Sequence, residues 1–135
     1  FVYGYAGIAG VVSIRNYVLF YNNTIHGTAE NYGAVYVLGN YNRVFNNIIS
    51  NYGAGVALLI YQINQNILNF NCYYSTAKIV TAYKTLGEWI AASGQDSNSY
   101  VVYPNFPIEG DFHQPHRFCN NTGTPLTEVT TDLMT

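Results

Sequence analysis

A six-residue pattern recurs at a nearly constant interval in the first half of this 135-residue chain. It reads aromatic residue, Asn, small or polar residue, two apolar residues and a polar residue, and it occurs at 21–26, 45–50 and 70–75. The Asn residues of these segments are 24 and then 25 positions apart. Such a period, with two or three strand-sized apolar runs in each repeat, is typical of a β-solenoid, because one repeat cannot bury its apolar face alone and stacked repeats can.

The repeated Asn predicts a specific hydrogen-bonded feature. An Asn at the same place in every coil lies above the Asn of the coil below, and its amide can donate to one neighbour and accept from the other, as in stacked amides of cross-β arrays. We therefore expect a ladder of Asn22, Asn46 and Asn71 inside a tight turn.

The composition excludes two classes of function. Charged residues make up 9% of the chain, against about 25% in ordinary globular proteins, and the net charge is -2. Such a chain cannot neutralise a row of phosphates, so we expect no nucleic-acid binding. It also lacks any apolar run of about 18 residues, so we expect no membrane span. Because it begins at Phe1 without a leader-like segment, we expect a processed or trimmed piece of a longer chain.

The segments Val18–Ile25 and Arg43–Ile49 resemble the right-handed parallel β-helix repeats of the pectate-lyase-like superfamily. The resemblance covers roughly residues 1–106. It implies an all-β fold: a right-handed parallel β-helix of about five coils, with a short capping helix and an irregular C-terminal tail over 107–135. It also implies a bacterial protein that is secreted or displayed at the cell surface.

A helix is predicted over 84–93, within the region of the coils. Thr85 and Glu88 have the spacing of a capping box, in which each side chain binds a backbone amide at the start of the helix. Trp89 lies on the apolar face of this helix. The segment resembles the closing coils of secreted β-helix proteins, where a helix covers the end that would otherwise expose apolar side chains and strand edges.

Glu109, Asp111 and His113 alternate along the tail. In an extended strand all three side chains share one face. Two carboxylates and an imidazole suit a hard cation with a general base. We therefore predict a Ca²⁺ site at Glu109 and Asp111, with Asp111 and His113 as catalytic residues. The alternative interpretation is an ordinary solvated strand.

Four further residues have structural interpretations. Asp96 follows the predicted helix and is expected to form a turn or cap. His26 is expected to face solvent from a turn. Cys72 is expected to be buried, and a disulfide from it to Cys119 is one of two open alternatives, because exported proteins permit one.

Tyrosine is unusually abundant, with 14 residues in the chain. A narrow interior cannot hold all of them, so some must lie outside. Rows of Tyr and Asn on a solenoid face suit carbohydrate, since rings stack on the apolar face of a sugar and amides bind its hydroxyl groups. Simple stacking of rings between coils is the alternative.

These features leave three hypotheses for function. The first is the C-terminal part of an exported parallel β-helix protein that binds or processes polysaccharide. The second is a small calcium-dependent hydrolase or lyase, acting on an ester, lactone or uronic acid through the 109–113 strand. The third is a structural solenoid segment of a surface adhesin. The polysaccharide hypothesis comes from the resemblance, since the coils lack the acidic cluster of pectate lyases.

Overall fold

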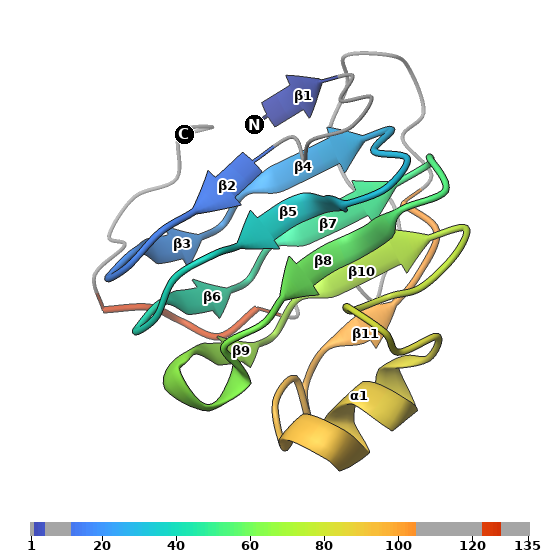
Figure 1. The fold of residues 1–135 in the computed structure, drawn as a ribbon. Coiled ribbons are helices and arrows are strands. Elements are labelled where there is room, and N and C mark those ends of the chain that lie inside the picture. The colour runs from blue at the N-terminus through green and yellow to red at the C-terminus, as the bar shows by residue number, and fades with distance from the viewer. Residues whose placement is uncertain (1, 5–11, 105–122, 128–135) are drawn as a thin grey trace.

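The computed structural model describes residues 2–4, 12–104 and 123–127. These residues are mostly β-structure, arranged as three sheets of parallel strands with one α-helix at one end (Figure 1). The β7 sheet contains, in hydrogen-bonded order, β1 (Val2–Gly4), β4 (Thr24–Gly27), β7 (Ile48–Asn51), β10 (Cys72–Ser75) and β11 (Tyr100–Val101). The β5 sheet contains β2 (Val12–Ile14), β5 (Gly33–Val37) and β8 (Val56–Ile60), and the β6 sheet contains β3 (Leu19–Tyr21), β6 (Arg43–Phe45) and β9 (Ile67–Asn69).

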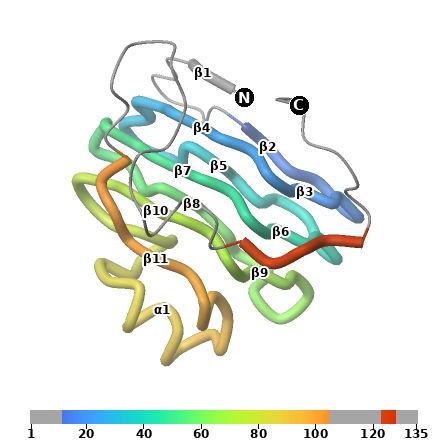
Figure 2. The backbone as a smooth tube through the Cα atoms, turned by 180° about the vertical axis from the view of Figure 1, so that it is seen from behind, coloured from blue at the N-terminus to red at the C-terminus, as the bar shows by residue number. Residues whose placement is uncertain are grey.

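Successive strands belong to the β7, β5 and β6 sheets in turn, and this order repeats along the chain. We call each set of three such strands a rung. Strands β1–β3 form the first rung, β4–β6 the second and β7–β9 the third. Neighbouring strands from β1 to β10 pair in parallel at an offset of 23 residues, as for Val12 and Val35, or 24, as for Leu19 and Arg43. Figure 2 shows the successive rungs stacked along one direction. The expectation of an all-β fold built from parallel strands is confirmed.

The three sheets share one hydrophobic core. Their inward side chains belong to a single buried cluster that includes Ile25, Ile49 and Tyr73 from the β7 sheet, Val35 and Leu58 from the β5 sheet, and Val44 and Leu68 from the β6 sheet. Burying each aliphatic side chain of this size contributes about 1.5–3 kcal/mol. Because these side chains come from successive rungs and pack on one another, no single rung could hold this core by itself.

An asparagine ladder runs through the two-residue turn between the β6 and β7 sheets. Asn23 Nδ2 donates to Asn47 Oδ1 over 3.1 Å, and Asn47 Nδ2 donates to Asn71 Oδ1 over the same distance. The backbone amides of Asn23 and Asn47 also donate to these oxygens, at 2.9 and 3.0 Å. The turn is therefore held by side-chain and main-chain bonds at every rung.

The predicted ladder was wrong by one residue at two of its three positions. Asn71 is a member, but Asn22 and Asn46 occupy the turn position before the ladder, with φ of 55° and 58°. This left-handed conformation suits Asn better than most residues. Asn22 is exposed, and Asn46 instead binds the tail: its Nδ2 donates to Thr124 O over 2.7 Å. The Asn-Asn pairs at 22–23 and 46–47 made both registers possible from sequence.

Helix α1 (Leu86–Ser93) lies beyond β9 and β10, at the end of the stack opposite β1 (Figure 1). It begins with the expected capping box: Glu88 N donates to Thr85 Oγ1 over 3.2 Å, and Thr85 N donates to Glu88 Oε2 over 3.1 Å. Trp89 is fully buried and belongs to the core cluster. Among the described residues, no helix has the length and apolar character needed to cross a membrane.

The ladder ends at Asp96, which is buried between α1 and β11. Its carboxylate accepts hydrogen bonds from Asn71 Nδ2 at 3.1 Å and from Trp89 Nε1 at 2.9 Å. Tyr73 OH at 3.1 Å and Ser99 Oγ also donate to it. An Asn here would direct its own N–H groups at these donors, whereas a carboxylate accepts from all of them. Asp96 does begin a turn, as expected, but its main role is to terminate the ladder on the cap.

Candidate functional site

The residues predicted to bind Ca²⁺ and to catalyse a reaction, Glu109, Asp111 and His113, lie outside the described residues. Within residues 2–4, 12–104 and 123–127, no group of three or more His, Cys, Asp or Glu side chains is placed to hold a metal ion. The three described acids lie apart and have structural contacts: Glu30 accepts from Ala54 N, Glu88 caps α1, and Asp96 is buried in the ladder. Other kinds of side chain form the candidate site.

A row of tyrosine and amide side chains follows the turns that lead from the β5 sheet to the β6 sheet. We call it the tyrosine–amide ridge, and its residues are Asn16, Tyr17, Asn40, Tyr41, Asn64 and Gln65. Tyr17 N donates to Asn40 O at 3.0 Å, and Tyr41 N donates to Gln65 O at 2.7 Å. Asn40 N also donates to Asn16 Oδ1 at 2.7 Å. These bonds place equivalent residues of three successive rungs side by side.

The two tyrosines of the ridge are exposed and stacked. Tyr17 is 75% exposed and Tyr41 54% exposed. Their ring centroids are 5.1 Å apart and the ring planes differ by 15°. The pair thus presents aromatic surface to solvent without being part of the core.

Both tyrosines also have an unfavourable backbone conformation. Each has a φ of 60°, which costs roughly 1–2 kcal/mol for a residue with a bulky side chain. Asn occupies the same conformation at 22 and 46 in this chain, with a smaller penalty. Aromatic residues at exposed, strained positions stabilise the fold poorly, and local strain of this kind is a pointer to function.

The outer face of the β6 sheet adjoins the ridge. Leu19, Arg43 and Ile67 share one register row across this sheet, and all three are exposed. The Arg43 guanidinium lies 5.4 Å from the centre of the Phe45 ring, within the range of a cation–π interaction. The ridge therefore borders a surface that is largely apolar and carries one cation.

A second aromatic cluster lies on the outer face of the β7 sheet. His26 is 4.6 Å from Tyr52, which is 5.1 Å from Tyr74, and Tyr74 is 5.0 Å from Tyr103, all between ring centroids. Burial, with help from the neighbouring Tyr103, raises the pKa of Tyr52 well above its usual value. These rings largely cover one another, so the cluster offers less free aromatic surface than the ridge.

His26 and Ser50 form a pair in the same region, but its geometry is structural. Their Nδ1 and Oγ atoms are 3.1 Å apart, and Ser50 Oγ donates to Ile25 O over 3.1 Å. Ser50 is fully buried, so it cannot act as a nucleophile on an external substrate. The expectation that His26 faces solvent from a turn was wrong: it is half-buried in β4, because the side chains of Ser50 and Tyr52 cover it.

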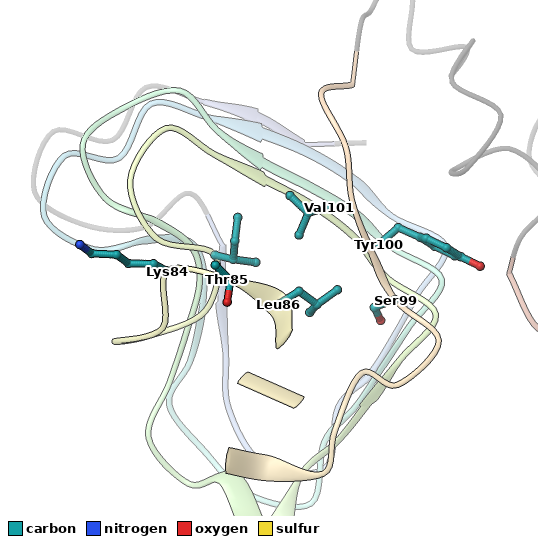
Figure 3. Close-up of a pocket in the computed structure, with 7 residues that line it drawn as sticks. Lys84, Thr85, Leu86, Ser99, Tyr100 and Val101 are labelled. Carbon is teal, nitrogen blue, oxygen red and sulfur yellow. The ribbon is translucent and has the colours of Figure 1, made fainter. Parts of the chain in front are cut away.

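A shallow pocket of about 500 Å³ lies between the start of α1 and β11. Figure 3 shows Leu86 and Val101 in its middle, with Lys84 and Tyr100 directed outward on opposite sides. The Glu88 carboxylate already accepts the backbone N–H of Lys84 over 3.0 Å. The pocket thus has an apolar lining with little polar chemistry directed into it.

Sequence reasoning identified rows of Tyr and Asn but not this particular surface. The signal was present: Tyr17 and Tyr41 are 24 positions apart, and Asn16, Asn40 and Asn64 repeat at the same interval. What the sequence did not show is that both tyrosines adopt a positive φ and remain exposed.

Comparisons of the chain with protein-family models, with curated protein sequences and with solved structures found no match.

Proposed function

We propose that this chain is the C-terminal part of an exported right-handed parallel β-helix protein, and that it binds polysaccharide on the tyrosine–amide ridge. The rotation of the chain through three parallel sheets supports the β-helix, as do the constant two-residue turn with its Asn ladder and the helical cap. Export is supported by the disulfide-bonded state of Cys72, since disulfides persist in oxidising compartments.

The observation that carries the binding proposal is the exposed, strained Tyr17–Tyr41 stack. An aromatic ring binds the C–H face of a pyranose, and Tyr also offers a hydroxyl group for hydrogen bonding. Amide side chains both donate and accept, which matches the dual character of sugar hydroxyl groups. The ridge supplies a tyrosine and an amide on each of its first two rungs and two amides on the third, at the roughly 4.8 Å spacing of paired strands.

The repetition of the ridge suits a polymer better than a single sugar. Tyr17, Tyr41 and Gln65 follow one another along the stack, so a chain of sugars can contact several rungs at once. One flexible ligand can then make several contacts at once, so weak contacts at each rung combine into a higher overall affinity.

A structural role is the second candidate, favoured by the Tyr52–Tyr74–Tyr103 cluster, in which the rings pack on one another and Tyr52 and Tyr74 are half-buried. A segment that only extends an adhesin needs such stacking and no ligand site. The calcium-dependent hydrolase or lyase stays a prediction, because Glu109, Asp111 and His113 lie outside the described residues.

The proposal is tested by affinity electrophoresis in gels that contain plant, algal or bacterial polysaccharides, followed by titration calorimetry with any that retard the protein. The double substitution Tyr17→Ala, Tyr41→Ala should weaken binding about tenfold or more, as expected for exposed aromatic residues at the centre of an interface. The matched control is Tyr103→Ala, because Tyr103 is 51% exposed and lies in the other aromatic cluster. Unchanged affinity in the double variant, or loss of binding in the control alone, would assign the ligand to another surface. No retention of the wild-type protein by any polysaccharide would favour the structural role.

A further inference from the structure

Among the tyrosine pairs of the described residues, Tyr17–Tyr41 combines close approach, nearly parallel rings and exposure. Other pairs lack one of these properties. Tyr74 and Tyr103 are as close, at 5.0 Å, but their rings are nearly perpendicular at 82°. Tyr52 and Tyr74 are tilted by 47° and half-buried. Tyr32 and Tyr36 are nearly parallel, but their centroids are 5.9 Å apart.

We propose that Tyr17 and Tyr41 form an oxidative cross-linking site, at which a one-electron oxidant joins their rings as dityrosine. Each phenol gives up one electron and one proton, and hydrogen peroxide, activated by a peroxidase, takes up both pairs and becomes two molecules of water. The two phenoxyl radicals then combine, and a carbon–carbon bond forms between the ring carbons next to the hydroxyl groups. Proton shifts within the product restore both aromatic rings, so the protein loses two hydrogen atoms in total.

The backbone holds the two phenols ready for this coupling. The bonds from Tyr17 N to Asn40 O and from Tyr41 N to Gln65 O fix the turns in adjacent rungs, so the rings meet without diffusion. Such preorganisation gives an intramolecular reaction a large effective concentration over a bimolecular one. Because both side chains are exposed, the oxidant can reach them, and rotation about χ1 and χ2 can turn the stacked rings edge to edge.

The cross-link would join the first rung to the second across 24 positions of sequence. It closes a loop in the unfolded chain, and such closures stabilise the folded state mainly by restricting the unfolded one. This inference does not depend on the proposed polysaccharide binding, since it uses only the proximity and exposure of two phenols.

The experiment treats dilute wild-type protein with a plant peroxidase and a stoichiometric amount of hydrogen peroxide. The expected result is a monomer that has lost two hydrogen atoms, the blue fluorescence of dityrosine, and one linked peptide pair that contains positions 17 and 41. Tyr41→Phe keeps a ring for stacking but removes the phenol, so this variant should lose the cross-link. Tyr103→Phe is the matched control and should retain it, because it changes the other close tyrosine pair.

Two results would overturn the proposal. One is a monomer cross-link that persists in Tyr41→Phe or maps to another tyrosine pair. The other is a wild-type product consisting only of covalent oligomers or of protein without dityrosine. Circular dichroism and urea unfolding of both Phe variants before oxidation establish that they are folded, so that loss of the product reports on the phenol.

Discussion

Replacement of Asp96 by Ala should destabilise the cap more than any other single loss of a carboxylate in the described chain. Asp96 is 1% exposed, and four side chains donate to its oxygens. Of these donors, Asn71 Nδ2 also donates to Val44 O over 2.9 Å, so it keeps a partner in the variant. Trp89 Nε1 and Tyr73 OH belong to fully buried residues and have no second acceptor among the hydrogen bonds of the described residues. The Ser99 hydroxyl also loses its acceptor, but it can rotate and Ser99 is 8% exposed, so it is left out of the magnitude.

The magnitude follows from those two orphaned donors. A buried donor without a partner costs about 1–3 kcal/mol, so Asp96→Ala should lower the free energy of unfolding by about 2–6 kcal/mol. That is a large share of the roughly 5–15 kcal/mol that stabilises a typical domain. Glu30→Ala is the matched control: this carboxylate is exposed and accepts one bond, from Ala54 N over 3.3 Å, so its loss should cost less than about 0.5 kcal/mol.

The free energies of unfolding are measured by urea unfolding, followed by the fluorescence of Trp89, the only tryptophan of the chain. This probe is part of the network, because Trp89 Nε1 donates to Asp96. Tyr73→Phe provides a milder test if Asp96→Ala does not fold, since it removes a single donor and should cost about 1–2 kcal/mol. An Asp96→Ala variant as stable as Glu30→Ala would refute the view that this carboxylate anchors the cap.

The pH dependence of the same variant has a definite sign. Burial raises the pKa of Asp96, although the hydrogen bonds from Ser99, Trp89, Asn71 and Tyr73 act in the opposite direction. A raised pKa in the folded state means that the protonated form favours folding, so this stabilisation is complete below the unfolded pKa of about 3.9. It is lost as the pH rises through the folded value. The destabilisation caused by Asp96→Ala should therefore be larger at acidic pH than at neutral pH.

Three further predictions concern the ladder, the outer cluster and the cysteines. Asn47→Ala should cost about 2 kcal/mol in urea unfolding, because Asn47 is buried in the ladder and its Oδ1 accepts from two N–H groups of Asn23; no loss of stability would place the ladder at another position. Burial lowers the pKa of His26, so its contribution to stability should be present above pH about 6.5 and fall as the pH drops through the folded value, and His26→Gln should flatten that part of the stability profile. Cys72 is disulfide-bonded, so alkylation of the denatured, unreduced protein should leave Cys72 unmodified and alkylation after reduction should modify it; a Cys72 thiol that reacts before reduction would contradict this.

Local signals made the cap and the strand pattern predictable. A capping box is defined by two residues three positions apart, and Thr85 and Glu88 satisfy it in the structure as the sequence suggested. The parallel sheets were predictable because apolar strand-sized runs repeat at a steady interval. Neither inference needed knowledge of distant contacts.

The ladder register and the role of Asp96 could not be obtained in the same way. Each Asn-Asn pair offers two candidates, and only the backbone conformation shows that the first residue forms the turn while the second bonds along the stack. Asp96 is 25 residues beyond Asn71, which matches the repeat interval. Helix α1 lies between them, however, so the sequence pattern did not indicate that Asp96 continues the ladder. The buried carboxylate depends on contacts with Trp89 and Tyr73 that no local pattern encodes.

The three turns of each rung differ in how they accommodate changes in chain length. The inward residues Phe20 and Ile25, Val44 and Ile49, and Leu68 and Tyr73 are five positions apart in every rung, across the turn that contains the ladder. Between the β5 and β6 sheets the steps between inward residues lengthen, from Val12–Phe20 to Val35–Val44 and then Leu58–Leu68. Gene variants that insert or delete single codons should therefore accumulate in the tyrosine-bearing turns and be eliminated from the ladder turn. The protein can therefore evolve new loops where the chain passes from the β5 sheet to the β6 sheet, while the turn from the β6 sheet to the β7 sheet keeps the rungs in register.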